Sequence, residues 1–281
     1  MDINAIGEID DVGASTSAYI KKKYPVLYPL MLAVFVVGIL ASVASLFFIN
    51  FRWLQDIGIL VVFGCIAWRG FIQNKIQSAF MEQLASAVGF TYEQKEDISN
   101  FKGHFMEMGH SQRVYDVLSG TYKNAPVRIF TYSFTVGYGK SQHTYSYTGF
   151  ELQTNVHLPD IVIHPKSAID FIGLGADWKP NGTKAISLEG NFNDYFKVFI
   201  PEGSEVETLQ ILAPDVMTDL IDNYKEFIQE FYSNAMYVIS TKVIRDKASF
   251  LNLVSLIDKL YDKVLPTLNE MATDTTAASN S

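Results

Sequence analysis

A long run without charged residues is the feature that most constrains how this chain can fold. No Asp, Glu, Lys or Arg occurs between Lys23 and Arg52, and the run includes LMLAVFVVGILASVASLFFI. Its part from Tyr28 to Ile49 would form roughly 33 Å of helix, and the hydrocarbon core of a bilayer is about 30 Å thick. We predict a transmembrane helix rather than a cleaved signal peptide, because the run is too long and no A-x-A-like cleavage site follows a short apolar region.

A second, shorter apolar segment follows. The charge-free residues Ile57–Trp68 would form only roughly 18 Å of helix, which by itself is typical of a re-entrant or buried helix. The wider segment Trp53–Ile72 is long enough to span, because Asp56 and Arg69 lie near its ends, where charges can reach the interface. We predict a second transmembrane helix and leave open whether it crosses the bilayer completely.

The link between the two predicted spans, near Asn50–Asp56, is too short for anything but a tight helical hairpin. Gly38 and Ser42 on the first span could let the second span approach closely. The alternative interpretation is that they are ordinary small residues of an apolar helix.

The distribution of Lys and Arg predicts the orientation of this hairpin. Lys21–Lys23 precede the first span, and Arg69 and Lys75 follow the second, whereas the link holds only Arg52. The positive-inside rule therefore places both termini in the cytoplasm. A single cysteine, Cys65, is consistent with a reducing compartment.

Composition and motifs exclude several classes of function. A formal net charge of −8 argues against nucleic acid as the main partner, because phosphate binding needs a basic surface. The sequence contains no zinc-ligand spacing, P-loop, G-x-S-x-G, H-E-x-x-H or G-x-G-x-x-G motif. We therefore predict no cofactor, no metal site and no catalytic residue.

The pattern of the remaining chain predicts an α+β fold with an antiparallel sheet packed by helices. We expect a disordered acidic N-terminus over 1–23, the membrane hairpin over 24–72, a cytoplasmic domain over 73–268 and a disordered tail over 269–281. An apolar stripe over 75–88 indicates a helix that ends at Gly89 and is separated from the second span by a break.

Residues 128–154 contain one of the most aromatic runs in the chain. Strict alternation over Arg128–Tyr138, a turn at 139–142 and renewed alternation from His143 indicate an antiparallel hairpin. The apolar positions change parity after Gly149, so we predict a bulge at Thr148–Gly149 that restores the buried face. The bulge would put seven rings on one face: Phe130, Tyr132, Phe134, Tyr138, Tyr145, Tyr147 and Phe150.

Those rings either form a core or an exposed patch that marks a partner site. The candidate surface for a partner or ligand consists of Tyr138, His143, Tyr145 and Tyr147. We expect most of the face to be core and the tip around Tyr138 and His143 to remain free.

Further elements are predicted downstream. Ile161–Ile163 and Phe196–Ile200 are each typical of a strand, and Pro214-Asp215 begins a helix. Two strand-like runs flank Ser233–Ala235, which indicates a second hairpin. Regular apolar spacing from Ala248 to Leu268 predicts a closing amphipathic helix.

The C-terminal half carries a phenylalanine-rich strand followed by a pattern similar to "ILTP..M..L", with Ala213 where threonine is common. The matching residues are Phe192, Phe196, Val198, Ile211, Leu212, Pro214, Met217 and Leu220. This pattern resembles that of a bacterial family of two-pass membrane proteins of unknown function, and the similarity covers about residues 24–268. The resemblance implies a bacterial inner-membrane location and implies no catalytic residue, because the family has no assigned activity.

These observations favour a membrane-anchored, non-enzymatic interaction module. Beyond the lipid bilayer, its partner would be another protein or a second copy of the chain. Two alternatives stay open. One is a membrane-bound hydrolase with a site around His104, His110 or His143, and the other is a lipid- or small-molecule-binding domain that uses the aromatic face as a pocket wall.

Overall fold

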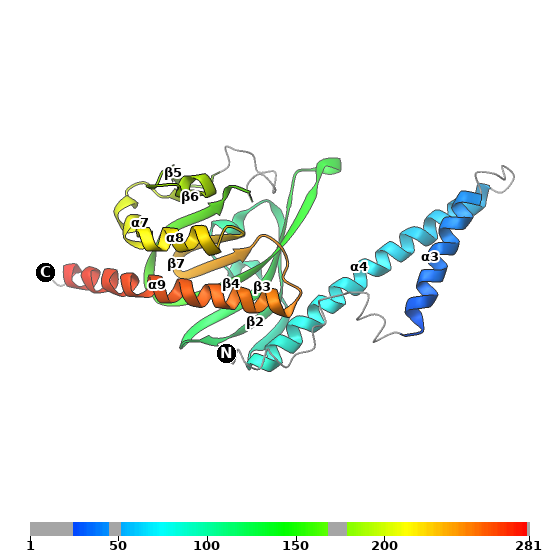
Figure 1. Cartoon of the computed structure of the whole chain (residues 1–281), viewed down its shortest axis with the longest axis horizontal. Coiled ribbons are helices and arrows are strands. Elements are labelled where there is room, and N and C mark those ends of the chain that lie inside the picture. The colour runs from blue at the N-terminus through cyan, green and yellow to red at the C-terminus, as the bar shows by residue number, and fades with distance from the viewer. Residues whose placement is uncertain (1–24, 45–51, 168–178, 280–281) are drawn as a thin grey trace. The chain divides into compact units, whose positions relative to one another are not determined.

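The computed structural model describes residues 25–44, 52–167 and 179–279 (Figure 1). These residues form two compact units. One lies within Ile9–Gln83 and includes Arg245–Lys247, and the other, which contains the sheet, lies within Leu84–Ile244 and Ala248–Ser281. The predicted disordered segment 1–23 lies outside the described residues.

Helix α3 spans Leu27–Ala44 and helix α4 spans Arg52–Val88. The predicted break between the second span and the helix over 75–88 is wrong, because α4 is continuous. Its sequence contains no proline, and a glycine such as Gly70 costs a helix far less than a proline does. The predicted end of the helix is confirmed. Gly89 has φ +74°, and the amide of Phe90 donates to the carbonyl of Ala85 at 2.8 Å.

The two helices approach each other as closely as glycine permits. A Cβ atom at Gly38 would lie 2.8 Å from Cγ1 of Val61, and one at Gly58 would lie 2.2 Å from Oγ of Ser42. The Ser42 hydroxyl donates to the carbonyl of Gly38 at 2.9 Å. Of the two interpretations of Gly38 and Ser42, close helix approach is therefore the one that the structure bears out.

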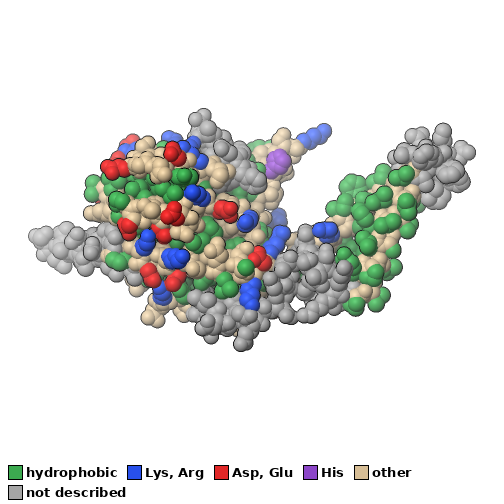
Figure 2. Space-filling view, viewed as in Figure 1, with side chains coloured by type: hydrophobic (Ala, Val, Ile, Leu, Met, Phe, Trp, Pro, Cys, Tyr) green, Lys and Arg blue, Asp and Glu red, His purple; other side chains and the backbone are tan. Residues whose placement is uncertain are grey.

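Apolar side chains remain exposed along both helices, as Figure 2 shows for the visible side. One helix, over Asp56–Val88, is long and apolar enough to cross a membrane, and α3 contains a shorter apolar stretch, Tyr28–Val43. Residues 45–49 of the predicted first span lie outside the described residues. The exposed apolar side chains include Leu30, Leu32, Val37 and Leu40 on α3 and Leu60, Phe63, Ile66 and Phe71 on α4.

The second unit contains an antiparallel sheet, which confirms the predicted α+β class. Its seven described strands follow the order β1-β2-β3-β4-β6-β5, and β7 also pairs with β4. The strands are β1 (Thr91–Glu96), β2 (His110–Tyr122), β3 (Ala125–Val136), β4 (His143–Pro165), β5 (Lys184–Ile186), β6 (Phe196–Ile200) and β7 (Phe227–Ser240).

Two predicted elements belong to longer strands. The segment Ile161–Ile163 is not a separate strand but the end of β4. The predicted second hairpin is also wrong, because β7 runs through Ser233–Ala235 and pairs with β4 on both sides of it. Ser233 has φ +58°, and the β4–β7 register shifts nearby, so the polar residues mark an irregularity within one strand rather than a turn.

The predicted bulge at Thr148–Gly149 is absent from the β3–β4 pair. Their register is continuous from Val127↔Leu152 to Val136↔His143. Phe150 therefore lies on the face opposite to Tyr147, so the predicted set of seven rings on one face is also wrong. The change of parity reflects a sheet that is buried on both faces.

Gly149 serves a different purpose from the one predicted. It pairs with Phe130, and a Cβ atom at this position would lie 2.5 Å from the Phe130 ring. Such a distance is too short for a real contact, so glycine is required to leave room for the ring.

Helices cover one face of the sheet. In the view of Figure 1, α8 (Pro214–Asn223) and α9 (Lys247–Ser279) lie over the part of the sheet that contains β7. The predicted helix start at Pro214 and the closing amphipathic helix are confirmed, although α9 begins at Lys247 and continues through Pro266 to Ser279. Short helices α6 (Phe192–Tyr195) and α7 (Glu205–Ile211) flank β6. The buried side chains of α9 are Phe250, Leu253, Val254, Leu256, Ile257, Leu260 and Val264.

Candidate functional site

The other face of the sheet is covered by the segment between β1 and β2, residues 97–109, which we call the cover segment. It contains two short 3-10 turns, Ile98–Asn100 and His104–Glu107. The Phe105 ring lies 5.2 Å from that of Tyr132 and 5.7 Å from that of Tyr147. The aromatic face is therefore interior. The buried cluster includes Phe101, Phe105, Met106 and Met108 from the cover segment and Phe130, Tyr132, Phe134, Tyr147 and Tyr237 from the sheet.

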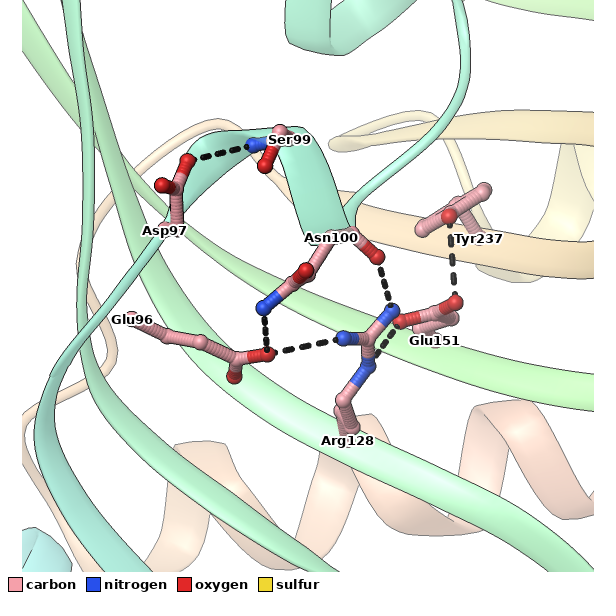
Figure 3. Close-up of polar contacts among 7 residues, drawn as sticks. All are labelled: Glu96, Asp97, Ser99, Asn100, Arg128, Glu151 and Tyr237. Carbon is pink, nitrogen blue, oxygen red and sulfur yellow. Dashed lines mark hydrogen bonds and ion pairs between the residues drawn. The ribbon is translucent and has the colours of Figure 1, made fainter.

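Arg128 on β3 fixes the beginning of the cover segment (Figure 3). Its Nε donates to Glu151 at 2.5 Å, its Nη1 donates to Glu96 at 3.1 Å, and its Nη2 donates to the carbonyl of Asn100 at 2.9 Å. The guanidinium also lies 3.9 Å from the centre of the Phe101 ring. The Arg128 side chain thus connects β1, β3 and β4 with the cover segment.

The carboxylate of Glu151 is as deeply buried as the rings around it, with 2% of the residue exposed. The hydroxyl of Tyr237 donates to it at 3.1 Å, so the carboxylate has two partners. Burial acts to lower the pKa of Arg128, but the hydrogen bond to Glu151 and the charges of Glu151 and Glu96 together outweigh burial, so the pKa of Arg128 is raised. A buried and fully paired ion pair of this kind is typical of a structural role.

Glu230 on β7 fixes the middle of the cover segment. Its Oε1 accepts the backbone N–H of His104 at 2.5 Å, and its Oε2 accepts that of Phe105 at 3.0 Å. Gly103 has φ +129°, and a Cβ atom there would lie 2.8 Å from Oε1 of Glu230, so only glycine fits. Burial raises the pKa of Glu230 to about 7, although the two N–H donors act in the opposite direction.

His104 extends the polar contacts around Glu230 toward the surface. Its Nε2 lies 2.9 Å from Oδ2 of Asp160, and its ring meets the edge of Tyr232 at 5.6 Å. The bond to Asp160 raises the pKa of His104. Within the described ranges no group of three or more His, Cys, Asp or Glu residues is arranged to hold a metal ion. The arrangement can bind and hold a proton, and it connects the cover segment to both β4 and β7.

The raised pKa values predict that stability falls as the pH rises. A folded-state pKa of about 7 for Glu230, against an ordinary value of 4.5, means that the native state binds more protons than the unfolded state in this range. Protonated His104 adds stability below its ordinary pKa that is lost above its raised one, so both groups act in the same direction.

The Glu230→Gln variant isolates the contribution of Glu230. The free energy of unfolding of the wild type minus that of the variant should fall by about 2–3 kcal/mol between pH 5 and pH 8. Chemical denaturation of the detergent-solubilised full chain at the two pH values measures this difference. A difference that stays constant with pH would contradict the prediction.

The four residues predicted as a partner surface are divided between core and surface. Tyr147 is buried with 1% exposed, and Tyr145 is half-buried with its ring 5.9 Å from that of Phe134. Tyr138 is 82% exposed, and His143 is exposed. We call residues 137–143, at the end of the β3–β4 hairpin, the hairpin tip.

The exposed tyrosine of the hairpin tip is held in place. The Tyr138 ring stacks on that of His110 at 4.9 Å with an interplanar angle of 11°, and Nε2 of His110 lies 2.8 Å from the carbonyl oxygen of Gly137. Gly137 has φ +79°, and a Cβ atom there would lie 2.4 Å from the carbonyl of Ser141. His110 therefore supports Tyr138, whereas His104 binds Asp160, so the two histidines make separate contacts.

Comparisons with known proteins give one structural match. No family model and no curated protein matches the chain. The fold is similar to that in the crystal structure of the mycobacterial trehalose monomycolate transport factor A, TtfA, with a TM-score of 0.50. The match covers 68% of this chain and 96% of TtfA at 13% sequence identity, so it concerns the fold alone.

Proposed function

We propose that this chain is a membrane-anchored, non-enzymatic interaction module whose sheet-containing unit contacts a protein partner through the hairpin tip. The observation that carries the proposal is the exposure of Tyr138, an aromatic side chain that stacks on His110 at the end of a hairpin. Tyrosine is enriched at interfaces because it presents a large contact area at a small cost in conformational entropy.

The helical unit supports the membrane anchor. Apolar side chains are exposed along both α3 and α4, and exposed apolar surface of this extent requires a cover. A bilayer is the cover that suits two closely packed apolar helices. The positive charges that flank the pair favour two crossings with both termini in the cytoplasm of a bacterial cell.

The aromatic face supports an interaction module over a lipid-binding pocket. Phe101, Phe105, Met106 and Met108 fill the space over that face, so the rings are in contact with protein. The His104 ring contacts Asp160, and the Glu230 carboxylate accepts two backbone N–H groups. These contacts account for both side chains as parts of the folded structure, so neither needs a catalytic role to explain its position.

Site-specific photo-crosslinking in native membranes tests the proposal. A photoreactive phenylalanine analogue at position 138 should give a discrete cross-linked product with one protein. The same analogue at Tyr195, a less exposed tyrosine on α6, should not. The Tyr138→Ala variant should prevent co-purification of the cross-linked protein and change the free energy of unfolding by less than about 0.5 kcal/mol. Equal cross-linking from both positions would argue against the hairpin tip as the contact surface.

A further inference from the structure

Strand β1 lies at the end of the sheet, and within the described ranges it pairs with β2 alone, so one of its backbone edges has no strand partner there. Its sequence is TYEQKE, and its central residues Glu93, Gln94 and Lys95 are all exposed. An edge strand presents a row of N–H and C=O groups that can pair with another strand.

The charges along this edge are complementary to those of a second copy of β1 that runs antiparallel to it. In a strand, residues two apart lie on the same face, so Glu93 and Lys95 share one face and Gln94 lies on the other. If two copies of β1 pair antiparallel about a twofold axis at Gln94, Glu93 of each copy lies opposite Lys95 of the other. Directly opposed residues of opposite charge stabilise a strand pair, and like charges destabilise it.

The same charges reject the neighbouring registers. A twofold axis perpendicular to the sheet leaves each side chain on the same face in both copies. Because directly opposed residues of an antiparallel pair share a face, the axis must be level with a residue rather than with a point between two residues. An axis at Glu93 opposes two glutamates, and an axis at Lys95 opposes two lysines. An axis at Tyr92 pairs only three residues of the strand with one another, 91–93. The register centred on Gln94 pairs the five residues 92–96 and opposes Glu93 to Lys95 twice, while Glu96 lies opposite Tyr92.

We infer that β1 is a self-association surface, through which two copies of this chain join their sheets edge to edge. Charged residues usually discourage edge pairing, but opposite charges two residues apart favour pairing with an identical strand in one register. A contact made by one six-residue strand of each copy is small beside the roughly 1,000 Å² of a stable interface. Confinement of both copies to one membrane offsets this weakness by raising their effective concentration. The inference uses the proposed anchor only for that concentration and is independent of the hairpin tip.

Cysteine cross-linking of the full-length chain in membranes tests this interface. In a Cys65→Ser background, Gln94→Cys should give a covalent dimer with a short bifunctional thiol reagent. Gln210→Cys, a matched exposed glutamine on α7, should not. Glu93→Lys opposes lysine to lysine at both positions and should lower the yield of dimer roughly tenfold. The exchange Glu93→Lys with Lys95→Glu re-creates both opposite-charge pairs and should restore the yield.

Several outcomes of this experiment would overturn the inference. Equal cross-linking at positions 94 and 210, or a charge exchange that fails to restore the dimer, overturns it. So does a product in which position 94 is joined to a different protein. Thermal melts of the variants at positions 93, 94, 95 and 210 should match that of the Cys65→Ser background, because these four side chains are exposed. If Gln94→Cys gives no dimer while position 138 still gives its cross-link, self-association is rejected and the proposed function stays intact.

Discussion

Replacement of Arg128 by methionine is expected to lower the free energy of unfolding by about 3–5 kcal/mol. Methionine keeps much of the volume but leaves the carboxylate of Glu151, whose side chain is 3% exposed, without its cation. It also removes the donor to the carbonyl of Asn100, which fixes the start of the cover segment. Chemical denaturation of the detergent-solubilised full chain measures the loss.

Two further variants show whether the buried charge is the cause. Adding Glu151→Gln to Arg128→Met removes the unpaired charge and keeps an acceptor for the hydroxyl of Tyr237. The double variant should therefore recover about 1–2 kcal/mol relative to Arg128→Met. Arg113→Met, on the exposed surface of β2, should change stability by less than about 0.5 kcal/mol. A double variant less stable than Arg128→Met would show that lost packing, not the charge, dominates.

Truncation of Tyr147 to alanine is expected to cost about 3–5 kcal/mol. Its ring is buried against Phe105 and Phe134, at 5.7 Å and 5.8 Å between ring centres, so the change opens a cavity under the cover segment. Thermal and chemical denaturation should both show the loss. Tyr138→Ala, at the exposed end of the same hairpin, is the matched control and should leave stability almost unchanged.

The hydroxyl of Tyr147 provides a second control. Its oxygen is buried and has no hydrogen-bond partner within the part of the chain that the structure describes. Burial raises the pKa of this phenol. Because an unpaired buried hydroxyl is unfavourable, Tyr147→Phe should preserve or raise stability. A loss of more than about 1 kcal/mol in Tyr147→Phe would mean that the hydroxyl has a partner after all.

Local patterns in the sequence predicted the elements that depend on local chemistry. Gly89 ends α4 because a positive φ is needed there, and Pro214 begins α8 because proline suits the first turn. The alternation over Arg128–Tyr138 predicted β3 for the same kind of reason. These signals lie within a few residues of the feature that they specify.

Features that depend on distant residues were not predictable in this way. The apolar positions change parity after Gly149 in either of two cases: a bulge restores one buried face, or both faces of the sheet are buried. The second case applies because the cover segment buries the face that the helices do not cover. Ser233 likewise is typical of a turn until β4 is known to run alongside it. The sequence analysis did not single out Glu230 as a contact of the cover segment, because its partners are backbone amides 125 and 126 residues away. A charged residue at a strand position surrounded by apolar residues, as in FIQEFY, was the one available signal.

The wide separation between Glu230 and the amides that it binds has a consequence for synthesis. The cover segment emerges from the ribosome long before β7, and until β7 is made neither Glu230 nor Tyr237 is present to hold it. During that interval the rings of Phe130, Tyr132 and Phe134 have an incomplete enclosure. Translation must therefore pass residue 237 before this apolar surface can close, and chains that stop earlier leave it open to chaperones and proteases.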